Sequence, residues 1–319
     1  MRKKILIICI ILLIGIVYVF STFYFSKKTT SRLSQNNKLI WDSDSTVVFE
    51  PSKAGYGAFY PRMIVLKNGD WLVAYDTNDG YSNTRCQVSR SKDEGKTWNI
   101  LSTASFGIGD AANAQMLQLK NGDLLLAYRI VNGDIRTLKV SKSNDNGKTW
   151  EEYSTIAEAE MSNYRGVWEP YMGFLPDGKI AVMYASEVYQ PKYPQVIEMK
   201  VSANNGKSWG KPLRVSDEIL SRDGMPVWTV TKDNKVLVAF EATDEPTGAK
   251  PFIIRYKISK DGYDWSGERK LLYSPKNKID SRAAAPYVTT LSNGVLVASC
   301  QVDKNPGGND MYILWSLDS

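Results

Sequence analysis

The clearest repeated motif in the sequence reads Ser141-Lys-Ser-Asn-Asp145-Asn-Gly147-Lys-Thr149-Trp150. Its variants read Ser89-Arg-Ser-Lys-Asp93-Glu-Gly95-Lys-Thr97-Trp98, Ser202-Ala-Asn-Asn205-Gly206-Lys-Ser208-Trp209 and, in degenerate form, Ser259-Lys-Asp261-Gly262-Tyr-Asp264-Trp265. The Asp or Asn side chain can bind nearby backbone N–H groups, the Gly accepts a positive φ, and the Trp offers a large apolar face. Each copy therefore predicts a structural turn. Because the copies recur roughly every 55 residues, they indicate a repeat array such as a propeller.

Each repeat also carries a hairpin signal before this turn. Short polar turns between apolar runs lie at Lys67-Asn68-Gly69-Asp70, Lys120-Asn121-Gly122-Asp123, Pro176-Asp177-Gly178-Lys179, Lys232-Asp233-Asn234-Lys235 and Ser292-Asn293-Gly294. A third strand leads into the Trp-bearing turn and a short fourth strand follows it. Four antiparallel strands make one propeller blade, so we expect an all-β propeller with five visible blades. The fifth repeat ends at Ser319, where its Trp-bearing turn should begin, so we expect a truncated chain.

The strand directions predict where a functional site lies. The hairpin turn and the Trp-bearing turn share one face, so the start of each first strand and the end of each second strand meet on the other face, the mouth. The first strands begin alike, at Pro61, Ala114, Pro170, Pro226 and Pro286. The residues just before these positions differ, and so do the ends of the second strands: Tyr60, Asn113, Glu169, Met225 and Ala285, then Asp76, Arg129, Ala185, Glu241 and Gln301. Divergent positions on a repeated scaffold are where a site is expected.

Two of these divergent residues are candidate catalytic groups. Glu169 lies in Trp168-Glu169-Pro170, and Glu241 ends the strand Val236-Leu-Val-Ala-Phe240-Glu241 in the next repeat. A carboxylate beside aromatic residues is partly desolvated, which raises its pKa unless a cation compensates. Two carboxylates with separated pKa values are what cleavage of a glycosidic bond needs. The structural alternative is a pair of rim carboxylates held by arginines such as Arg222, but matched positions in neighbouring repeats favour function.

Other residues near the mouth are candidates for substrate binding. Aromatic rings can stack on the C–H faces of sugars, whereas each ring alone is more often packed at a blade edge. Arginine and polar groups could bind hydroxyls or carboxylates. The candidates are Arg62, Asp76, Asp110, Asn113, Arg165, Trp168, Trp228, Arg282 and Tyr287.

Composition excludes several other classes of function. The chain has no histidine, which removes histidine triads and most zinc sites, and it has no phosphate- or dinucleotide-binding fingerprint. We expect no metal and no cofactor. Cys86 and Cys300 lie in strand-like runs and are expected to be buried free thiols. The net charge of +6 arises mainly from Arg2, Lys3, Lys4, Lys27 and Lys28 near the N-terminus, so nothing indicates nucleic-acid binding.

The N-terminus predicts a membrane anchor. Basic residues 2–4 precede an apolar run from Ile5 to Phe25, which is long enough to span a bilayer and is followed by no clear cleavage site. We therefore divide the chain into a signal anchor (1–25), a polar tether (26–40) and a propeller (41–319). The expected location is the cell membrane with an extracellular domain, and the alternative is secretion after signal cleavage. We expect a monomer.

The Trp-bearing turns resemble the Asp-boxes of the sialidase-like (BNR-repeat) β-propellers. Within that group, Trp168-Glu169-Pro170 and the strand end Val-Ala-Phe-Glu241 resemble glycoside hydrolase family 93, the exo-α-L-arabinanases. The resemblance implies a six-bladed propeller that releases arabinobiose from 1,5-α-L-arabinan with retention of configuration, through Glu169 and Glu241. We assign Glu169 as nucleophile and Glu241 as acid/base, and the motif is equally compatible with the reverse.

The chain departs from that family pattern in two ways. It shows no sixth blade, and none of its residues matches the tyrosine that the family uses near the end of the domain. Two alternatives therefore stay open. One is a sialidase, which needs three converging arginines, for which Arg62, Arg222 and Arg282 are the candidates. The other is a non-catalytic or truncated carbohydrate-binding propeller.

Overall fold

The computed structural model describes residues 45–160, 165–245, 251–275, 280–304 and 308–316. The chain divides into two compact units, Met1–Ser45 and Thr46–Ser319, and the first lies almost wholly outside these ranges. No helix that could cross a membrane occurs in the described ranges. The predicted signal anchor and tether fall outside them.

The described part of the second unit consists of β-strands joined by turns. Four sheets have four strands and one has three, each in sequence order, and we call them blades 1 to 5. Blade 1 contains β1 (Ala58–Val65), β2 (Trp71–Thr77), β3 (Arg85–Ser91) and β4 (Asn99–Thr103). Blade 2 contains β5 (Asp110–Gln118), β6 (Leu124–Asn132), β7 (Ile135–Ser143) and β8 (Glu151–Glu160). Blade 3 contains β9 (Val167–Phe174), β10 (Ile180–Ser186), β11 (Val196–Ser202) and β12 (Leu213–Ser216). Blade 4 contains β13 (Asp223–Val230), β14 (Val236–Ala242), β15 (Ile253–Ser259) and β16 (Lys270–Tyr273). Blade 5 contains β17 (Asp280–Thr290), β18 (Leu296–Lys304) and β19 (Asn309–Ser316).

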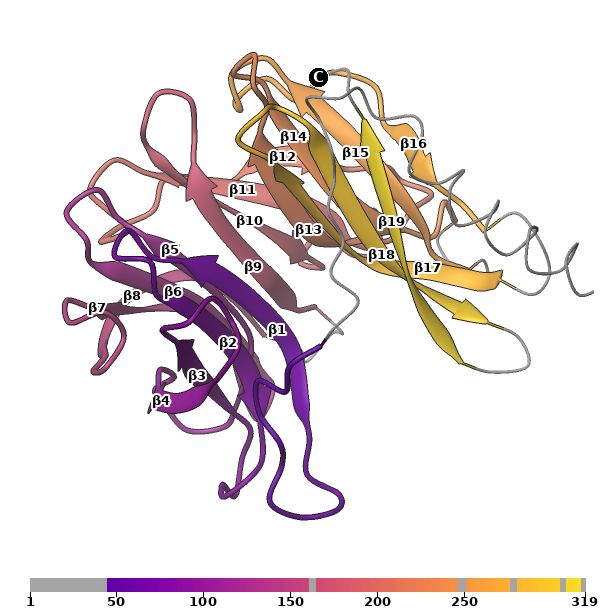
Figure 1. Ribbon diagram of the computed structural model, residues 1–319. Helices are drawn as coiled ribbons and strands as arrows, with labels where there is room; N and C mark the ends of the chain where they lie inside the picture. The colour runs from indigo at the N-terminus through magenta and orange to yellow at the C-terminus, as the bar shows by residue number, and fades with distance from the viewer. Residues whose placement is uncertain (1–44, 161–164, 246–250, 276–279, 305–307, 317–319) are drawn as a thin grey trace, which may run out of the picture. The chain divides into compact units, whose positions relative to one another are not determined.

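All pairings within the five blades are antiparallel, and the first strand of each blade contacts the first strand of the next. Figure 1 shows the blades following one another, from the indigo strands of blade 1 to the yellow strands of blade 5. The predicted all-β propeller with five visible blades is therefore confirmed.

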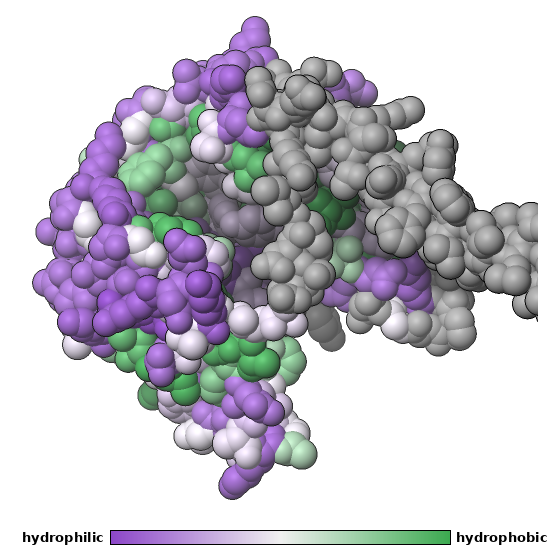
Figure 2. Space-filling view, viewed as in Figure 1, coloured by the Kyte–Doolittle hydropathy of each residue, from purple (hydrophilic) through white to green (hydrophobic). Residues whose placement is uncertain are grey.

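The hydrophobic core lies between successive blades. The second strands β6, β10 and β14 are almost wholly buried because neighbouring sheets cover both of their faces, which explains their unbroken apolar runs. Tyr75, Tyr128, Tyr184 and Phe240 occupy equivalent positions on the second strands of blades 1 to 4 and are among the largest fully buried side chains. Each such buried side chain contributes roughly 1.5–3 kcal/mol to folding. On the face in Figure 2, hydrophilic residues cover most of the outer surface and hydrophobic residues gather in the recesses between sheets.

The Asp-boxes form the predicted turns. In blade 2, Asp145 accepts hydrogen bonds from the backbone N–H and the hydroxyl of Thr149, at 2.9 and 2.6 Å. Gly147 has a φ of 84°, which a residue with a Cβ adopts only under strain. The indole of Trp150 donates to the Gly147 carbonyl and to the Ser102 hydroxyl of blade 1, so the box also joins neighbouring blades. Cys86 and Cys300 are buried free thiols, as predicted.

We expect Asp145→Ala to lower the free energy of unfolding by roughly 1–2 kcal/mol, because the Thr149 N–H loses its acceptor. Asp145→Asn is the matched control and should cost less, since Asn204 fills this position in blade 3 and accepts the Ser208 N–H at 2.9 Å. Burial raises the pKa of Asp145, but hydrogen bonds led by those from Thr149 outweigh it and lower the pKa to about 2. The stabilisation is therefore present above pH ~4 and is lost as the pH falls towards 2. Thermal unfolding of both variants across this range checks the prediction, and equal melting temperatures for the two would contradict it.

Candidate active site

A strained backbone position opens the first strand of every blade. Tyr60, Asn113, Glu169, Met225 and Ala285 have φ values of 50°, 60°, 56°, 49° and 50°. Each lies where the pairing of the first and second strands shifts register, at a β-bulge. A left-handed conformation costs a residue with a Cβ about 1–2 kcal/mol, so the surrounding fold must impose it. These are the five positions that the sequence predicted to line the mouth.

The bulges turn backbone N–H groups towards carboxylates of the preceding blade. Asp76 of blade 1 accepts the N–H of Asn113 at 2.8 Å. Glu169 of blade 3 accepts the N–H of Met225 at 2.7 Å, and Glu241 of blade 4 accepts that of Ala285 at 3.0 Å. Three carboxylates are thus each fixed through one oxygen.

Glu169 is held in a position that favours its protonated form. Burial raises its pKa, and the neighbouring charge of Glu241 raises it further, to about 7. The Met225 N–H and the positive charges of Arg222 and Arg129 oppose this rise without cancelling it. A carboxyl group with such a pKa can give and take a proton near neutral pH.

A cation, Arg222, lies beside Glu241. Glu241 is only 6% exposed, and its pKa is raised, mainly by burial. The Ala285 N–H and the charges of Arg222 and Arg282 oppose that rise. Its Oε1 lies 3.9 Å from Nη1 of Arg222, which is half-exposed at the mouth. This cation favours the ionised form of Glu241.

The two glutamates meet at Gly224. A methyl group added there would lie 3.5 Å from Oε1 of Glu241 and 3.7 Å from Oε2 of Glu169. These two oxygens can be no farther apart than the sum of those distances, roughly 7 Å, which is within the range of carboxyl separations in glycosidases. The same methyl group would lie only 2.9 Å from Oε1 of Gln195, so a side chain here would have to displace the Gln195 amide. The sequence-predicted pair is therefore brought together.

A second polar cluster lies on the blade 1–2 side of the mouth. Arg129 is largely buried near the charges of Asp76 and Glu169, and its guanidinium lies 4.9 Å from the ring centre of Trp168. The indole of Trp168 donates to Oε2 of Glu187 at 2.8 Å, which fixes the ring. Tyr60 is half-exposed beside the same charges. The cluster offers a flat ring, a cation and a carboxylate to a ligand.

We expect Asp76→Asn to stabilise the protein at alkaline pH. Burial raises the pKa of Asp76 to about 7, so the folded state binds this proton more tightly than the unfolded state does. Stability then falls as the pH rises from about 4 to 7 and stays low above it. Asparagine removes that loss, so the variant should melt a few degrees above wild type at pH 8 and no higher at pH 4. Asp110→Asn, an exposed rim carboxylate, is the control, and parallel melting curves for Asp76→Asn and wild type at all pH values would refute this assignment.

The other predicted site residues lie in varied surroundings. Asp110 is exposed on the rim, where it accepts the Thr84 N–H. The guanidinium of Arg165 donates to the Gln190 carbonyl. Arg282 pairs with Asp303 at 2.7 Å, and its charge opposes the rise in the pKa of Glu241.

Two predicted aromatic ligands make contacts between blades. Trp228 is 4% exposed in the core between blades 3 and 4, where its indole donates to the Tyr171 carbonyl and packs on Gly173. It therefore does not reach the mouth. Tyr287 contacts Tyr171 edge to face, and the guanidinium of Arg62 lies within 6 Å of both ring centres. These three side chains join blades 1, 3 and 5.

Sequence reasoning left Arg129, Gly224 and Gln195 out of the predicted site. Arg129 is among the divergent mouth residues in the sequence, at the same position as Asp76 and Glu241, but only its contact with Trp168 makes it a candidate ligand. Gly224 and Gln195 carry no such signal, because their role arises from contacts between blades 3 and 4. Asn113 has a buried Oδ1 that accepts no hydrogen bond from the described residues. The described ranges contain no group of three or more acidic, Cys or His side chains able to hold a metal ion.

Comparisons with known proteins agree with this architecture. A family model described as a BNR repeat-like domain matches residues 20–217. The fold resembles that of the Penicillium chrysogenum α-L-arabinanase solved with arabinobiose, with 23% identity, 84% of each chain covered and a TM-score of 0.71. It also resembles the family 93 α-L-arabinofuranosidase of Fusarium graminearum, with 20% identity, 83% of each chain covered and a TM-score of 0.69. A Hadza microbial sialidase matches at 14% identity and a TM-score of 0.57, over 82% of this chain and 56% of the sialidase. No curated protein sequence matches the chain.

Proposed function

The chain belongs to the BNR repeat-like domain family, and from this premise we propose that it is a retaining exo-glycosidase acting on arabinan-type oligosaccharides. One observation carries the proposal: Glu169 and Glu241, from neighbouring blades, present carboxylate oxygens to the same point beside Gly224. Their separation of no more than roughly 7 Å is compatible with the ~5–5.5 Å between carboxyl groups in retaining enzymes. The similarity in fold to an arabinanase solved with arabinobiose supports the choice of substrate class.

The charges around the pair favour Glu241 as nucleophile and Glu169 as acid/base, the reverse of the roles assigned from sequence. A nucleophile must be ionised, and Arg222 lies 3.9 Å from Glu241. An acid/base must hold a proton near neutral pH, and the pKa of Glu169 is raised to about 7. Neighbouring groups thus separate two otherwise identical carboxyl groups, as glycosidic cleavage requires.

The reaction then has two steps. Glu169 donates its proton to the glycosidic oxygen while a carboxylate oxygen of Glu241 attacks the anomeric carbon, so the leaving alcohol departs and a glycosyl ester forms. Glu169, now ionised, takes a proton from water, and the resulting hydroxide attacks the same carbon and releases Glu241. Two displacements restore the starting configuration. The N–H groups of Met225 and Ala285 keep both carboxyl groups oriented throughout.

Substrate contacts beyond the glutamates would come from the second cluster. The ring of Trp168 and the charge of Arg129 face the same part of the mouth. The apolar run in residues 5–25 supports placement of the domain outside the cell, tethered to the membrane or secreted, and we propose that it acts there as a monomer.

No observation favours the sialidase alternative. Arg62 lies over Tyr171 and Tyr287, Arg222 faces Glu241, and Arg282 pairs with Asp303. The charges of Arg222 and Arg282 both act on Glu241, one of the two proposed catalytic glutamates, whereas a sialidase uses its three arginines to bind the carboxylate of the substrate.

Product analysis tests the proposed function. The full-length protein is incubated with debranched 1,5-arabinan, an aryl α-L-arabinofuranoside and sialyllactose, and NMR follows the first anomer released. We expect arabinobiose in its starting configuration and no sialic acid. Release of sialic acid would establish the alternative enzyme, and no turnover of any substrate by folded protein would establish a non-catalytic propeller.

A further inference from the structure

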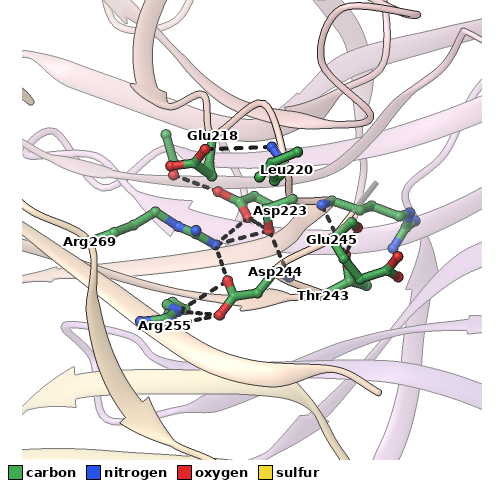
Figure 3. Close-up of polar contacts among 11 residues, drawn as sticks. Glu218, Leu220, Asp223, Thr243, Asp244, Glu245, Arg255 and Arg269 are labelled. Atoms are coloured by element: carbon green, nitrogen blue, oxygen red, sulfur yellow. Dashed lines mark hydrogen bonds and ion pairs between the residues drawn. The ribbon is translucent and has the colours of Figure 1, made fainter. Parts of the chain in front are cut away.

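A buried ion network lies behind the mouth in blade 4. Figure 3 shows Arg269 reaching between the carboxylates of Asp223 and Asp244, with Arg255 on the far side of Asp244. The guanidinium of Arg269 lies 2.8 Å from Asp223 and 3.0 Å from Asp244. Asp223 is fully buried and Arg269 is largely buried, whereas the side chains of Asp244 and Arg255 are 25% and 23% exposed, so the network runs from the interior towards the surface.

Serine hydroxyls extend the network to the preceding residues. Ser221 is fully buried, accepts a hydrogen bond from Arg269 at 3.0 Å and donates to Asp223 at 2.6 Å. The second oxygen of Asp223 accepts the hydroxyl of Ser216. The backbone N–H of Asp223 donates to the Gln195 carbonyl, and that of Arg222 donates to the Thr243 hydroxyl. Residues 221–223 are therefore held from several sides.

The attached segment also forms the wall of the proposed active site. Arg222 faces Glu241, Gly224 leaves the space in which both glutamates approach each other, and Met225 donates its N–H to Glu169. Residues 222, 224 and 225 thus face the glutamates. Residues 221 and 223 contact Arg269. Residues 221–224 alternate between the two environments because the segment enters strand β13, where successive residues point to opposite faces. Met225 does not follow this alternation, because it lies at the β-bulge and contributes its backbone N–H.

We propose that Arg269 is a positioning residue: through Ser221 and Asp223 it holds Arg222, Gly224 and Met225 against the two glutamates. The expected effect of Arg269 on the rate of catalysis rests on the proposed function. Its expected effect on the positions and pKa values of the two glutamates does not. Arg269 follows the Asp-box of blade 4 and contacts neither glutamate. It acts by fixing the wall, and a displacement of a supporting group by ~1 Å can cost about a hundredfold in rate.

Arg269→Met tests the proposal by removing the guanidinium while keeping much of the side-chain length. We expect kcat on an aryl arabinofuranoside to fall at least about tenfold, with a smaller change in KM. The acid limb of kcat/KM should move to higher pH, because the Arg222 charge and the Met225 N–H that lower the glutamate pKa values are displaced. Arg269→Lys should recover part of kcat by keeping the charge.

The control is Arg90→Met, which breaks an ion pair of similar burial with Asp70 in blade 1, away from the glutamates. It should lower the melting temperature and leave the pH profile unchanged. If Arg269→Met behaves in the same way, Arg269 is only structural. If Arg269→Met does not fold, Ser221→Ala, which removes one hydroxyl, decides by the same readouts.

A readout without turnover separates this inference from the proposed function. Carbon-13 NMR of the glutamate carboxyl groups, assigned with Glu169→Gln and Glu241→Gln, follows their titration directly. Upward shifts of both midpoints in Arg269→Met support the positioning role even if wild type hydrolyses none of the glycosides. Unchanged midpoints overturn it even if wild type is an active arabinanase.

Discussion

Glu241→Gln should lower kcat on an aryl α-L-arabinofuranoside by at least about a thousandfold, because a neutral amide cannot form the glycosyl ester. The fold should persist, since the glutamine Oε1 can still accept the Ala285 N–H that the carboxylate accepts at 3.0 Å. The melting temperature at pH 8 should rise, because burial disfavours the charge that the substitution removes. Steady-state kinetics and calorimetry on the same preparation measure both effects.

The matched control is Glu198→Gln in blade 3. Glu198 is 3% exposed, compared with 6% for Glu241, but it accepts the Tyr189 hydroxyl and lies near Arg214 instead of the mouth. This substitution should change stability and leave kcat within about twofold. Full activity in Glu241→Gln, or an equal loss in both variants, would show that Glu241 has no special role.

The fold could be predicted from sequence because its signals are local and repeated. Each Asp-box specifies its own turn through neighbours a few residues away, as Asp145 and Thr149 show. Hairpin turns then fix the register, and register fixes which strand ends meet at the mouth. The positions of Glu169 and Glu241 followed from that register alone, although their contact at Gly224 did not.

The prediction for Trp228 is wrong because the direction of its side chain depends on another blade. Trp228 lies two residues after Pro226, close to the mouth in sequence, but its indole turns into the interface between blades and packs on Gly173. Arg282 lies near the start of its strand, where it pairs with Asp303 of the neighbouring strand while its charge acts on Glu241. Sequence position predicts which end of a blade a residue occupies, but contacts between blades decide which way it points.

The ion network shows the same limit more strongly. Arg269 and Asp223 are distant in sequence and belong to no motif, so nothing in the sequence predicts that they pair. Removing one partner of such a pair leaves an uncompensated buried charge and destabilises the fold. The pair is therefore informative about which segment of the chain is held rigidly. The strained φ of Glu169 and Met225 points to the same requirement, since residues in this conformation persist only where the surroundings enforce it.

Glu169→Ala should affect the two steps of the reaction differently, depending on the leaving group of the substrate. Hydrolysis of arabinan should fall by about a thousandfold or more, because its poor leaving group needs a proton. An aryl arabinofuranoside with an acidic phenol should still form the glycosyl ester, since its leaving group needs no proton, and release of phenol should show a burst. The basic limb of the pH profile, set by the Glu169 pKa of about 7, should disappear because no acid remains to lose its proton.

Azide then distinguishes the two role assignments. Azide can attack the glycosyl ester without a general base, so it should accelerate turnover by Glu169→Ala and give an arabinosyl azide with the configuration of the substrate. In Glu241→Ala, azide can enter only the space left by the nucleophile, and its product should be inverted. An inverted azide from Glu169→Ala would instead make Glu169 the nucleophile, and the Arg222 charge beside Glu241 would then have to be explained by substrate binding.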